Sequence, residues 1–344
     1  MIRPLACLFI LALLSLPIAS GRDAPYLELE TADALRLQIF LDQSHFGPGV
    51  IDGKPGRFTT LSLQAWNEAN GYPPDDIENA MKAARREVKH PMATAVVSEV
   101  ARQWVDPSLP YDSDRAGQAA KKRMSYRRMS EFLAERYHCD EDFLRAINAP
   151  QNLEKLEAGD SILVPNVEPF LIEKLGANSH EKDDELSSRH VVVDTKANQL
   201  RIYKPAPAAL VVAKPGDAIA INEGRKNKNL VATFPITPGR PKFIAIGTWE
   251  LRNMVEMPWW RYDQTFLDTG ERGPEEETLN IPPGPNSPVG IIWNGTSKRG
   301  IGLHGTSNPE TIGRARSSGC IRLCNWDAAR LPKFIRPGAT IEIR

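Results

Sequence analysis

His304 and Cys320 are the two residues of this sequence best suited to nucleophilic chemistry. A thiol becomes a strong nucleophile when it loses its proton, and an adjacent imidazole can accept that proton. The two residues lie sixteen positions apart. This spacing leaves room for one strand and for a connecting loop that brings the chain back beside it. Gly305 and Gly319 stand beside them and would let backbone or substrate approach closely. The pair is a candidate cysteine nucleophile with a histidine base.

By themselves, one cysteine and one histidine do not distinguish a catalytic pair from an inert buried thiol and a structural histidine. The consecutive backbone N–H groups of residues 318–320 could also stabilise a developing oxyanion. Cys324 allows two interpretations, a thiol that forms a disulfide with Cys320 or a small buried residue. A zinc site made of His304, Cys320 and Cys324 would lack a fourth ligand at a recognisable spacing, so we expect no metal.

The segments around both residues resemble the L,D-transpeptidase catalytic (YkuD) domain. Its signature joins His-Gly-Thr, here residues 304–306, to Ser-x-Gly-Cys-x-Arg, here residues 317–322. The likeness spans residues 189–344 and includes residues 234–239, 246–249, 281–290 and 312–313. The resemblance implies no cofactor and these site residues: Cys320 as nucleophile, His304 as general base and later acid, the backbone carbonyl of Gly305 as the group that holds the imidazole tautomer, the backbone N–H of Gly319 as an oxyanion donor, Arg322 as an electrostatic or loop-bracing residue, and Thr306, Ser317 and Ser318 as substrate-binding residues.

The activity implied by this resemblance is acyl transfer on the stem peptides of peptidoglycan. Cys320 would form a thioester with a tetrapeptide stem and release the terminal D-Ala. An amine of diaminopimelate or of a protein lysine would then take the acyl group, which gives a 3→3 crosslink or attaches a protein to the wall. Water as acceptor would make the enzyme an L,D-carboxypeptidase. The resemblance also implies acylation by carbapenems. A general cysteine peptidase and a non-catalytic wall-binding protein are the alternatives.

The elements that must position this pair are mostly strands. Segments 190–194 and 200–203 form an expected hairpin, and segments 230–236, 244–251, 289–293 and 340–343 are expected strands. We expect a helix after Asn325, with Asn325 as its N-cap. The fold class predicted for residues 189–344 is therefore a mostly antiparallel β domain. The aromatic run 258–262 would form a lid over the stem peptide or the lid's own small core.

Residues 27–75 form the first of two predicted accessory modules. Apolar residues between 35 and 41 predict one helix, and residues 58–66 predict a second that Thr59 or Thr60 could cap. The turn at residues 51–56 separates them. This pattern resembles the small helical peptidoglycan-binding-like fold. A helical spacer is the alternative.

Residues 124–168 form the second predicted module. Segments 132–137 and 140–144 predict two short helices, and segment 162–164 predicts a closing strand. The pattern resembles a LysM domain, a βααβ module that binds glycans, although Met129–Glu131 replaces the usual Gly-Asp-Thr start of its first helix. Together the two modules predict a multidomain α+β protein that contacts glycan strands.

Residues 1–21 have the layout of a secretory signal peptide: Arg3, an apolar run and small residues at the end. An uncleaved membrane anchor is the alternative, since about 20 apolar residues span a bilayer. We expect export across the inner membrane and a periplasmic location at the cell wall. Cleavage would leave Cys139, Cys320 and Cys324, and this odd number implies a free thiol or an intermolecular bond.

Length and charge agree with this organisation. The chain has 344 residues, 43 basic and 43 acidic, with 41% hydrophobic residues. This length suggests two or three domains, and the composition excludes a mostly disordered chain. The zero net charge argues against a nucleic-acid-binding protein.

Overall fold

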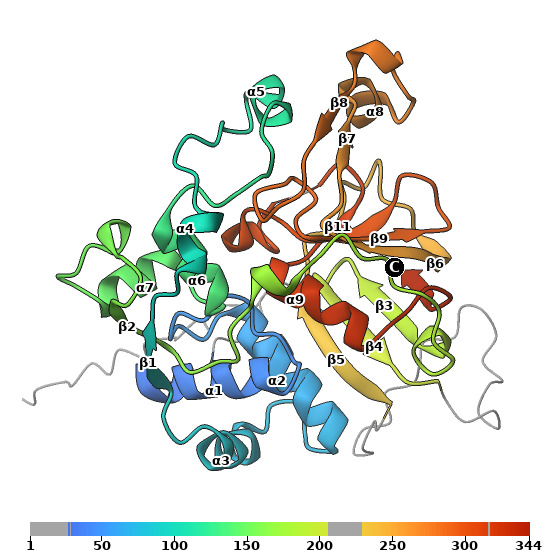
Figure 1. The fold of residues 1–344 in the computed structure, drawn as a ribbon. Helices are drawn as coiled ribbons and strands as arrows, with labels where there is room; N and C mark the ends of the chain where they lie inside the picture. The colour runs from blue at the N-terminus through green and yellow to red at the C-terminus, as the bar shows by residue number, and fades with distance from the viewer. Residues whose placement is uncertain (1–26, 28, 206–228, 316) are drawn as a thin grey trace, which may run out of the picture.

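Helices dominate the first half of the described chain and strands the second half (Figure 1). The computed structural model describes residues 27, 29–205, 229–315 and 317–344. The signal peptide predicted at residues 1–21 lies outside these residues. No helix within the described ranges is both long and apolar enough to cross a membrane. The α-helices are α1 (Thr31–Gln43), α2 (Arg57–Asn70), α3 (Ile77–Glu87), α4 (Val100–Trp104), α5 (Arg115–Ala119), α6 (Met129–Arg136), α7 (Glu141–Ile147), α8 (Gln264–Thr269) and α9 (Asn325–Arg330).

The first accessory segment is helical, as predicted, but it extends past residue 75. Helix α3 packs against α1 and α2, and its N-cap Asp76 accepts a hydrogen bond from the Asn79 N–H at 2.9 Å. Helix α3 lies beyond the predicted boundary because its buried face consists mainly of alanines, which give a weak hydrophobic pattern. The predicted threonine cap is wrong, since Gly56 precedes α2 and both Thr59 and Thr60 lie inside it.

The second accessory segment has the predicted strand–helix–helix–strand order with a different first strand. Strand β1 (Met92–Val96) pairs antiparallel with β2 (Ser161–Pro165), and α6 and α7 lie between them in sequence. Strand β1 lies outside the predicted range 124–168, because an insertion that contains α4 and α5 separates it from α6. The short, partly exposed β1 has little alternating pattern, so only its partner strand identifies it.

Eight strands of the described residues form one sheet in the order β11-β10-β9-β6-β12-β3-β4-β5. Five neighbouring pairs are antiparallel, and the β10–β11 and β12–β3 pairs are parallel, which confirms a mostly antiparallel β domain. The expected 190–203 hairpin is present, whereas β6 and β9 run further along the chain than predicted. These strands are β3 (His190–Asp194), β4 (Gln199–Tyr203), β5 (Leu230–Pro235), β6 (Gly247–Glu256), β9 (Ile292–Thr296), β10 (Gly302–His304), β11 (Ile321–Arg322) and β12 (Thr340–Ile343).

An arm built from β7 (Trp260–Tyr262), α8 and β8 (Leu279–Ile281) projects from this sheet (Figure 1). Trp260 and Tyr262 pack around a small cluster of Leu109, Met124 and Ile281. Two of these three residues come from the insertion before α6. The aromatic run therefore contributes to a small core of its own, which joins the arm to the accessory segment.

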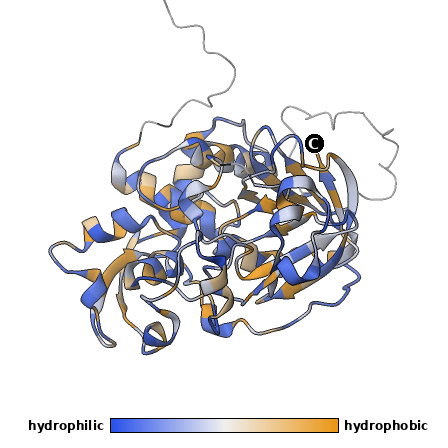
Figure 2. Cartoon of the chain, turned by 90° about the horizontal axis from the view of Figure 1, so that it is seen from above, coloured by the Kyte–Doolittle hydropathy of each residue, from blue (hydrophilic) through white to orange (hydrophobic). Residues whose placement is uncertain are grey.

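Helix α9 is where the three segments of the chain meet, and it lies near the centre of the molecule (Figure 1). Arg330 of α9 donates to both carboxylate oxygens of Asp42 in α1, at 2.9 and 2.7 Å. His138, which follows α6, contacts the same carboxylate at 3.1 Å and stacks on Trp326 with a centroid distance of 5.3 Å. One hydrophobic cluster also runs through all three segments. In Figure 2, helices and strands carry both polar and apolar colours, as expected of amphipathic elements that share a core.

Asn325 does not cap α9 as predicted. Cys324 is the N-cap residue, and Asn325 is the first helical residue. The amide of Asn325 instead reaches the carboxylate of Glu135 in α6. A capping side chain must turn back toward its own helix, and this one is directed to a partner from another segment.

Asp42→Asn should lower the free energy of unfolding by about 3 kcal/mol, because the buried Arg330 would keep only Asp327, at 3.3 Å, as an ion-pair partner. Burial acts to raise the pKa of Asp42, but Arg330 and His138 hold it well below its usual range. The contribution of ionised Asp42 to the free energy of unfolding is therefore complete above the ordinary aspartate pKa, and it declines as the pH falls below that pKa. Urea denaturation at neutral and acidic pH measures both effects.

Asp33→Asn is the matched control for this junction. Asp33 also lies in α1 and pairs with Arg36 and Arg85 closer to solvent. Its loss should cost less than about 1 kcal/mol. Equal losses in the two variants would contradict a special role for the Asp42 junction.

Candidate active site

The pairing of two short strands brings His304 and Cys320 together. Strand β10 ends at His304 and pairs in parallel with β11, so that His304 lies opposite Arg322 and Leu303 opposite Ile321. Cys320 immediately precedes β11. Residues two apart on a strand share a face, so Cys320 lies on the same face as Arg322, two positions along the ladder from the His304–Arg322 pair. No hydrogen bond joins the thiol and the imidazole in the described structure, a common situation before substrate binds.

The imidazole of His304 is held as a neutral base. Its Nδ1 lies 2.7 Å from the carbonyl oxygen of Gly305, which is the contact that the family resemblance implied. Nδ1 therefore carries the proton, and Nε2 is left as the accepting atom. Burial, and next the charge of Arg322, lower the pKa of His304 to about 3. Trp293 stacks on the ring at a centroid distance of 5.6 Å.

The thiol of Cys320 is protonated at rest. Burial raises its pKa, while a backbone hydrogen bond from Gly302 and the charge of Arg322 act in the opposite direction. The thiol donates to the Gly300 carbonyl at 3.4 Å. Cys320 is partly exposed, whereas Cys139 and Cys324 are buried. A neutral thiol beside a neutral imidazole must transfer its proton as the sulfur attacks.

Comparison with known proteins assigns a family to this site. Residues 209–343 match the family model of YkuD, the L,D-transpeptidase catalytic domain. This part of the chain is an L,D-transpeptidase catalytic domain. The match begins inside the predicted range 189–344, and β3 and β4 add two strands to the same sheet before it.

The relatives that this chain matches are similar to it over short stretches. Proteins of Bacillus licheniformis and Bacillus subtilis carry the provisional name L,D-transpeptidase YkuD. They are 42% and 40% identical over 65 residues, which are 19% of this chain and 39% and 40% of those proteins. The chain thus spans about two fifths of their length. A crystal structure of L,D-transpeptidase 1 from Mycobacterium tuberculosis is 16% identical with a TM-score of 0.28, over 46% of this chain and 61% of that chain.

The predicted oxyanion donor of the L,D-transpeptidase domain is engaged within its own loop. The Gly319 N–H donates to the Ser317 hydroxyl at 3.2 Å, and this hydroxyl donates to the Cys320 carbonyl. Gly319 has a φ of +133°, a conformation that requires glycine. An oxyanion would have to displace Ser317 from this N–H. Ser318 is exposed, and Thr306 is buried with its hydroxyl accepting from the Asn308 N–H at 3.3 Å.

Arg322 acts on the site mainly through its charge. Its backbone pairs with Thr237 at 2.9 and 3.0 Å, but its guanidinium forms no hydrogen bond with any described residue and its Nε is buried without a partner. The charge lowers the pKa of both Cys320 and His304. Of the two predicted roles, this geometry favours the electrostatic one over bracing by side-chain hydrogen bonds.

Cys324 is fully buried at the start of α9, and burial raises its pKa well above the usual value. A protonated thiol inside the core is a poor nucleophile and a poor partner for disulfide exchange. This environment favours the interpretation of Cys324 as a small packing residue.

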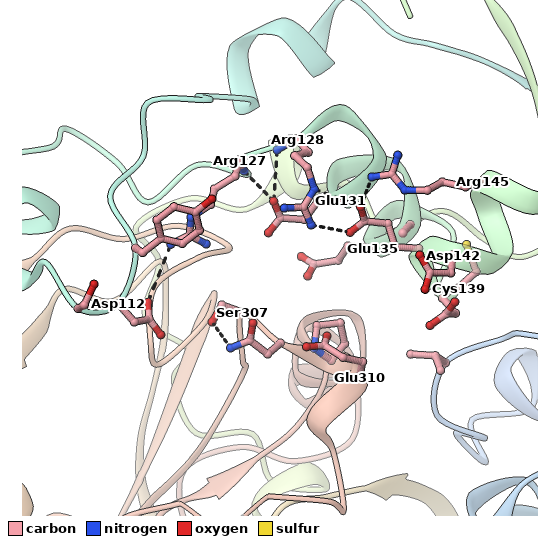
Figure 3. Close-up of a pocket in the computed structure, with 18 residues that line it drawn as sticks. Asp112, Arg127, Arg128, Glu131, Glu135, Cys139, Asp142, Arg145, Ser307 and Glu310 are labelled. Atoms are coloured by element: carbon pink, nitrogen blue, oxygen red, sulfur yellow. Dashed lines mark hydrogen bonds and ion pairs between the residues drawn. The ribbon is translucent and has the colours of Figure 1, made fainter. Parts of the chain in front are cut away.

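A pocket of about 770 Å³ lies between the second accessory segment and the loop 307–310, and it was not predicted (Figure 3). Its walls come from α6, α7, the loop 111–113 and the loop 307–310. The last of these loops follows directly after Thr306. No sequence pattern indicates this pocket, because segments that are distant along the chain form its walls.

Proposed function

We propose that this protein is an exported cysteine acyl-transferase that acts on peptidoglycan stem peptides. The observation that carries the proposal is a neutral imidazole, oriented by the Gly305 carbonyl, next to Cys320 within an L,D-transpeptidase catalytic domain. The partners would be a tetrapeptide stem as donor, a diaminopimelate or protein lysine amine as acceptor, and glycan strands through the two accessory segments. The protein would act in the periplasm at the cell wall.

The first half of the reaction forms a thioester. The sulfur of Cys320 attacks the carbonyl carbon at the L-centre of diaminopimelate, and the thiol proton passes to Nε2 of His304. The positive charge of Arg322 opposes charge on the imidazole and favours the sulfur anion. The tetrahedral intermediate then collapses, His304 returns the proton to the departing amine, and D-Ala leaves.

The second half of the reaction repeats these steps with an acceptor. An amine attacks the thioester carbonyl, its proton passes to His304, and the thiolate leaves and regains that proton. A 3→3 crosslink forms when the amine belongs to diaminopimelate, and a wall-attached protein forms when it belongs to a lysine. With water as acceptor, the same residues would give an L,D-carboxypeptidase, which is the second candidate.

Incubation of the purified protein with tetrapeptide muropeptides tests this function. Mass spectrometry should detect crosslinked dimers that have lost one D-Ala. Free tripeptide without dimers would indicate the carboxypeptidase. Unchanged muropeptides, with a protein that still binds insoluble sacculi, would indicate a wall-binding protein and refute the acyl-transferase.

A further inference from the structure

A carboxyl group from the second accessory segment reaches the interior of the catalytic domain. Glu135 of α6 is only 5% exposed. Both of its oxygens accept from Nδ2 of Asn325 at 3.1 Å. The Tyr126 hydroxyl donates to the same carboxylate at 2.7 Å. Figure 3 shows Glu135 in the wall of the pocket, between the accessory helices and the loop that carries Ser307 and Glu310. This contact therefore links α6 to α9.

Asn325 connects this carboxyl group to the backbone that orients His304. Its Nδ2 also donates to the Pro285 carbonyl at 3.1 Å, and its Oδ1 accepts from the Ile291 N–H at 3.3 Å. A Cβ placed on Gly305 would lie 2.1 Å from that Oδ1, so the amide packs directly against Gly305. The carbonyl of Gly305 is the group that holds Nδ1 of His304.

Packing alone does not explain the carboxyl group at position 135. No basic side chain forms an ion pair with Glu135 in the described part of the chain, and burial raises its pKa to about 8. A buried carboxyl without a cation costs stability that an apolar side chain of similar size would not. In either protonation state the group keeps an oxygen that accepts from Asn325. Its hydrogen bonds thus hold the Asn325 amide with Nδ2 toward Glu135 and Oδ1 toward Gly305.

We propose that Glu135 is a positioning residue for His304, which it orients through Asn325 and the Gly305 backbone. The second accessory segment thereby supplies a residue that supports the active site of the L,D-transpeptidase domain. The inference rests on the proposed function of the His304–Cys320 pair. A positional error of about 1 Å in a catalytic group can cost about a hundredfold in rate, so loss of this support should be measurable.

Glu135→Met and Glu135→Gln form the test pair, because methionine fills the space without an acceptor and glutamine keeps an acceptor oxygen. Glu135→Met should slow formation of the meropenem adduct by about tenfold to a hundredfold, measured as intact mass against time. Glu135→Gln should restore most of the rate. Glu141→Gln is the control, since Glu141 lines the same pocket but pairs only with residues of its own module.

A spectroscopic measurement separates positioning from stability. In ¹⁵N NMR spectra, the wild type should show a His304 imidazole protonated at Nδ1, with the signal assigned by its loss in His304→Gln. Glu135→Met should change this signature, whereas Glu135→Gln and Glu141→Gln should not. A Glu135→Met protein that keeps the wild-type signature and acylation rate, with only a lower Tm, would overturn the inference.

Failure of the proposed function gives a different result. A wild type that forms no adduct and leaves muropeptides unchanged would refute the acyl-transferase. The imidazole signature would still decide whether Glu135 orients His304.

Discussion

Cys320→Ser should abolish the covalent meropenem adduct. Serine keeps the shape of the side chain but replaces the thiol by a hydroxyl, whose proton is far harder to remove. A histidine whose pKa is lowered to about 3 by burial and by Arg322 is a weak base, and its orienting partner is a neutral carbonyl. Such a base cannot activate a hydroxyl effectively. Intact-mass spectrometry of the folded variant after incubation with meropenem measures the loss.

Cys324→Ser is the matched control for this substitution. Cys324 lies four residues away, is fully buried and keeps a raised pKa, so its replacement should leave acylation close to that of the wild type. An adduct on folded Cys320→Ser would place the nucleophile elsewhere. A loss of acylation in Cys324→Ser with normal folding would instead revive the interpretation of Cys324 as a reactive thiol.

His304→Gln should slow acylation of Cys320 by about 10²–10⁴-fold, the usual contribution of a general base. Glutamine can hydrogen-bond but cannot take up the thiol proton. Because burial raises the pKa of Cys320, little thiolate exists at neutral pH without this base. The difference in acylation rate between the wild type and His304→Gln should become smaller as the pH rises, since hydroxide then removes the thiol proton of Cys320 directly. Second-order acylation rates of both proteins, measured from neutral to alkaline pH, check the size of the rate loss and its dependence on pH.

His190→Gln is the control for loss of a histidine. His190 belongs to the same sheet, is partly exposed and contacts Glu342 at 2.9 Å on β12. Its replacement should leave the acylation rate unchanged. A similar deficit in both variants would mean that His304 acts through folding, and an unchanged rate in His304→Gln would remove it from the mechanism.

The local chemistry of the site could be predicted from the sequence. The types and spacing of His304 and Cys320 suggested a base and a nucleophile. The family resemblance implied the Gly305 carbonyl as the partner of the base, and the contact between His304 and that carbonyl is present. Six of the eight strands of the sheet were also expected from runs of strand-forming residues, whereas β10 and β11 were not, because they are only three and two residues long. The catalytic roles of these residues stay predictions until the variants are measured.

The partners of buried polar groups were not predictable in this way. Glu135 and Asn325 are separated by 190 positions, and Asp42 and Arg330 by 288. A hydrophobic pattern predicts which face of a helix is buried, but not which distant residue meets it. For this reason Asn325 was expected as a helix cap and the accessory segments as separate modules.

The sequence by itself indicated the candidate pair, six of the eight strands of the sheet and the helical character of the accessory segments. The strands and helices follow from neighbours along the chain, through residue type and periodicity, and the pair follows from the motifs that resemble the YkuD domain. Only the tertiary structure decided that α9 is shared by three segments and that burial keeps both His304 and Cys320 neutral. Desolvation and long-range hydrogen bonds depend on what covers a residue in space, and that is settled only when distant segments pack together.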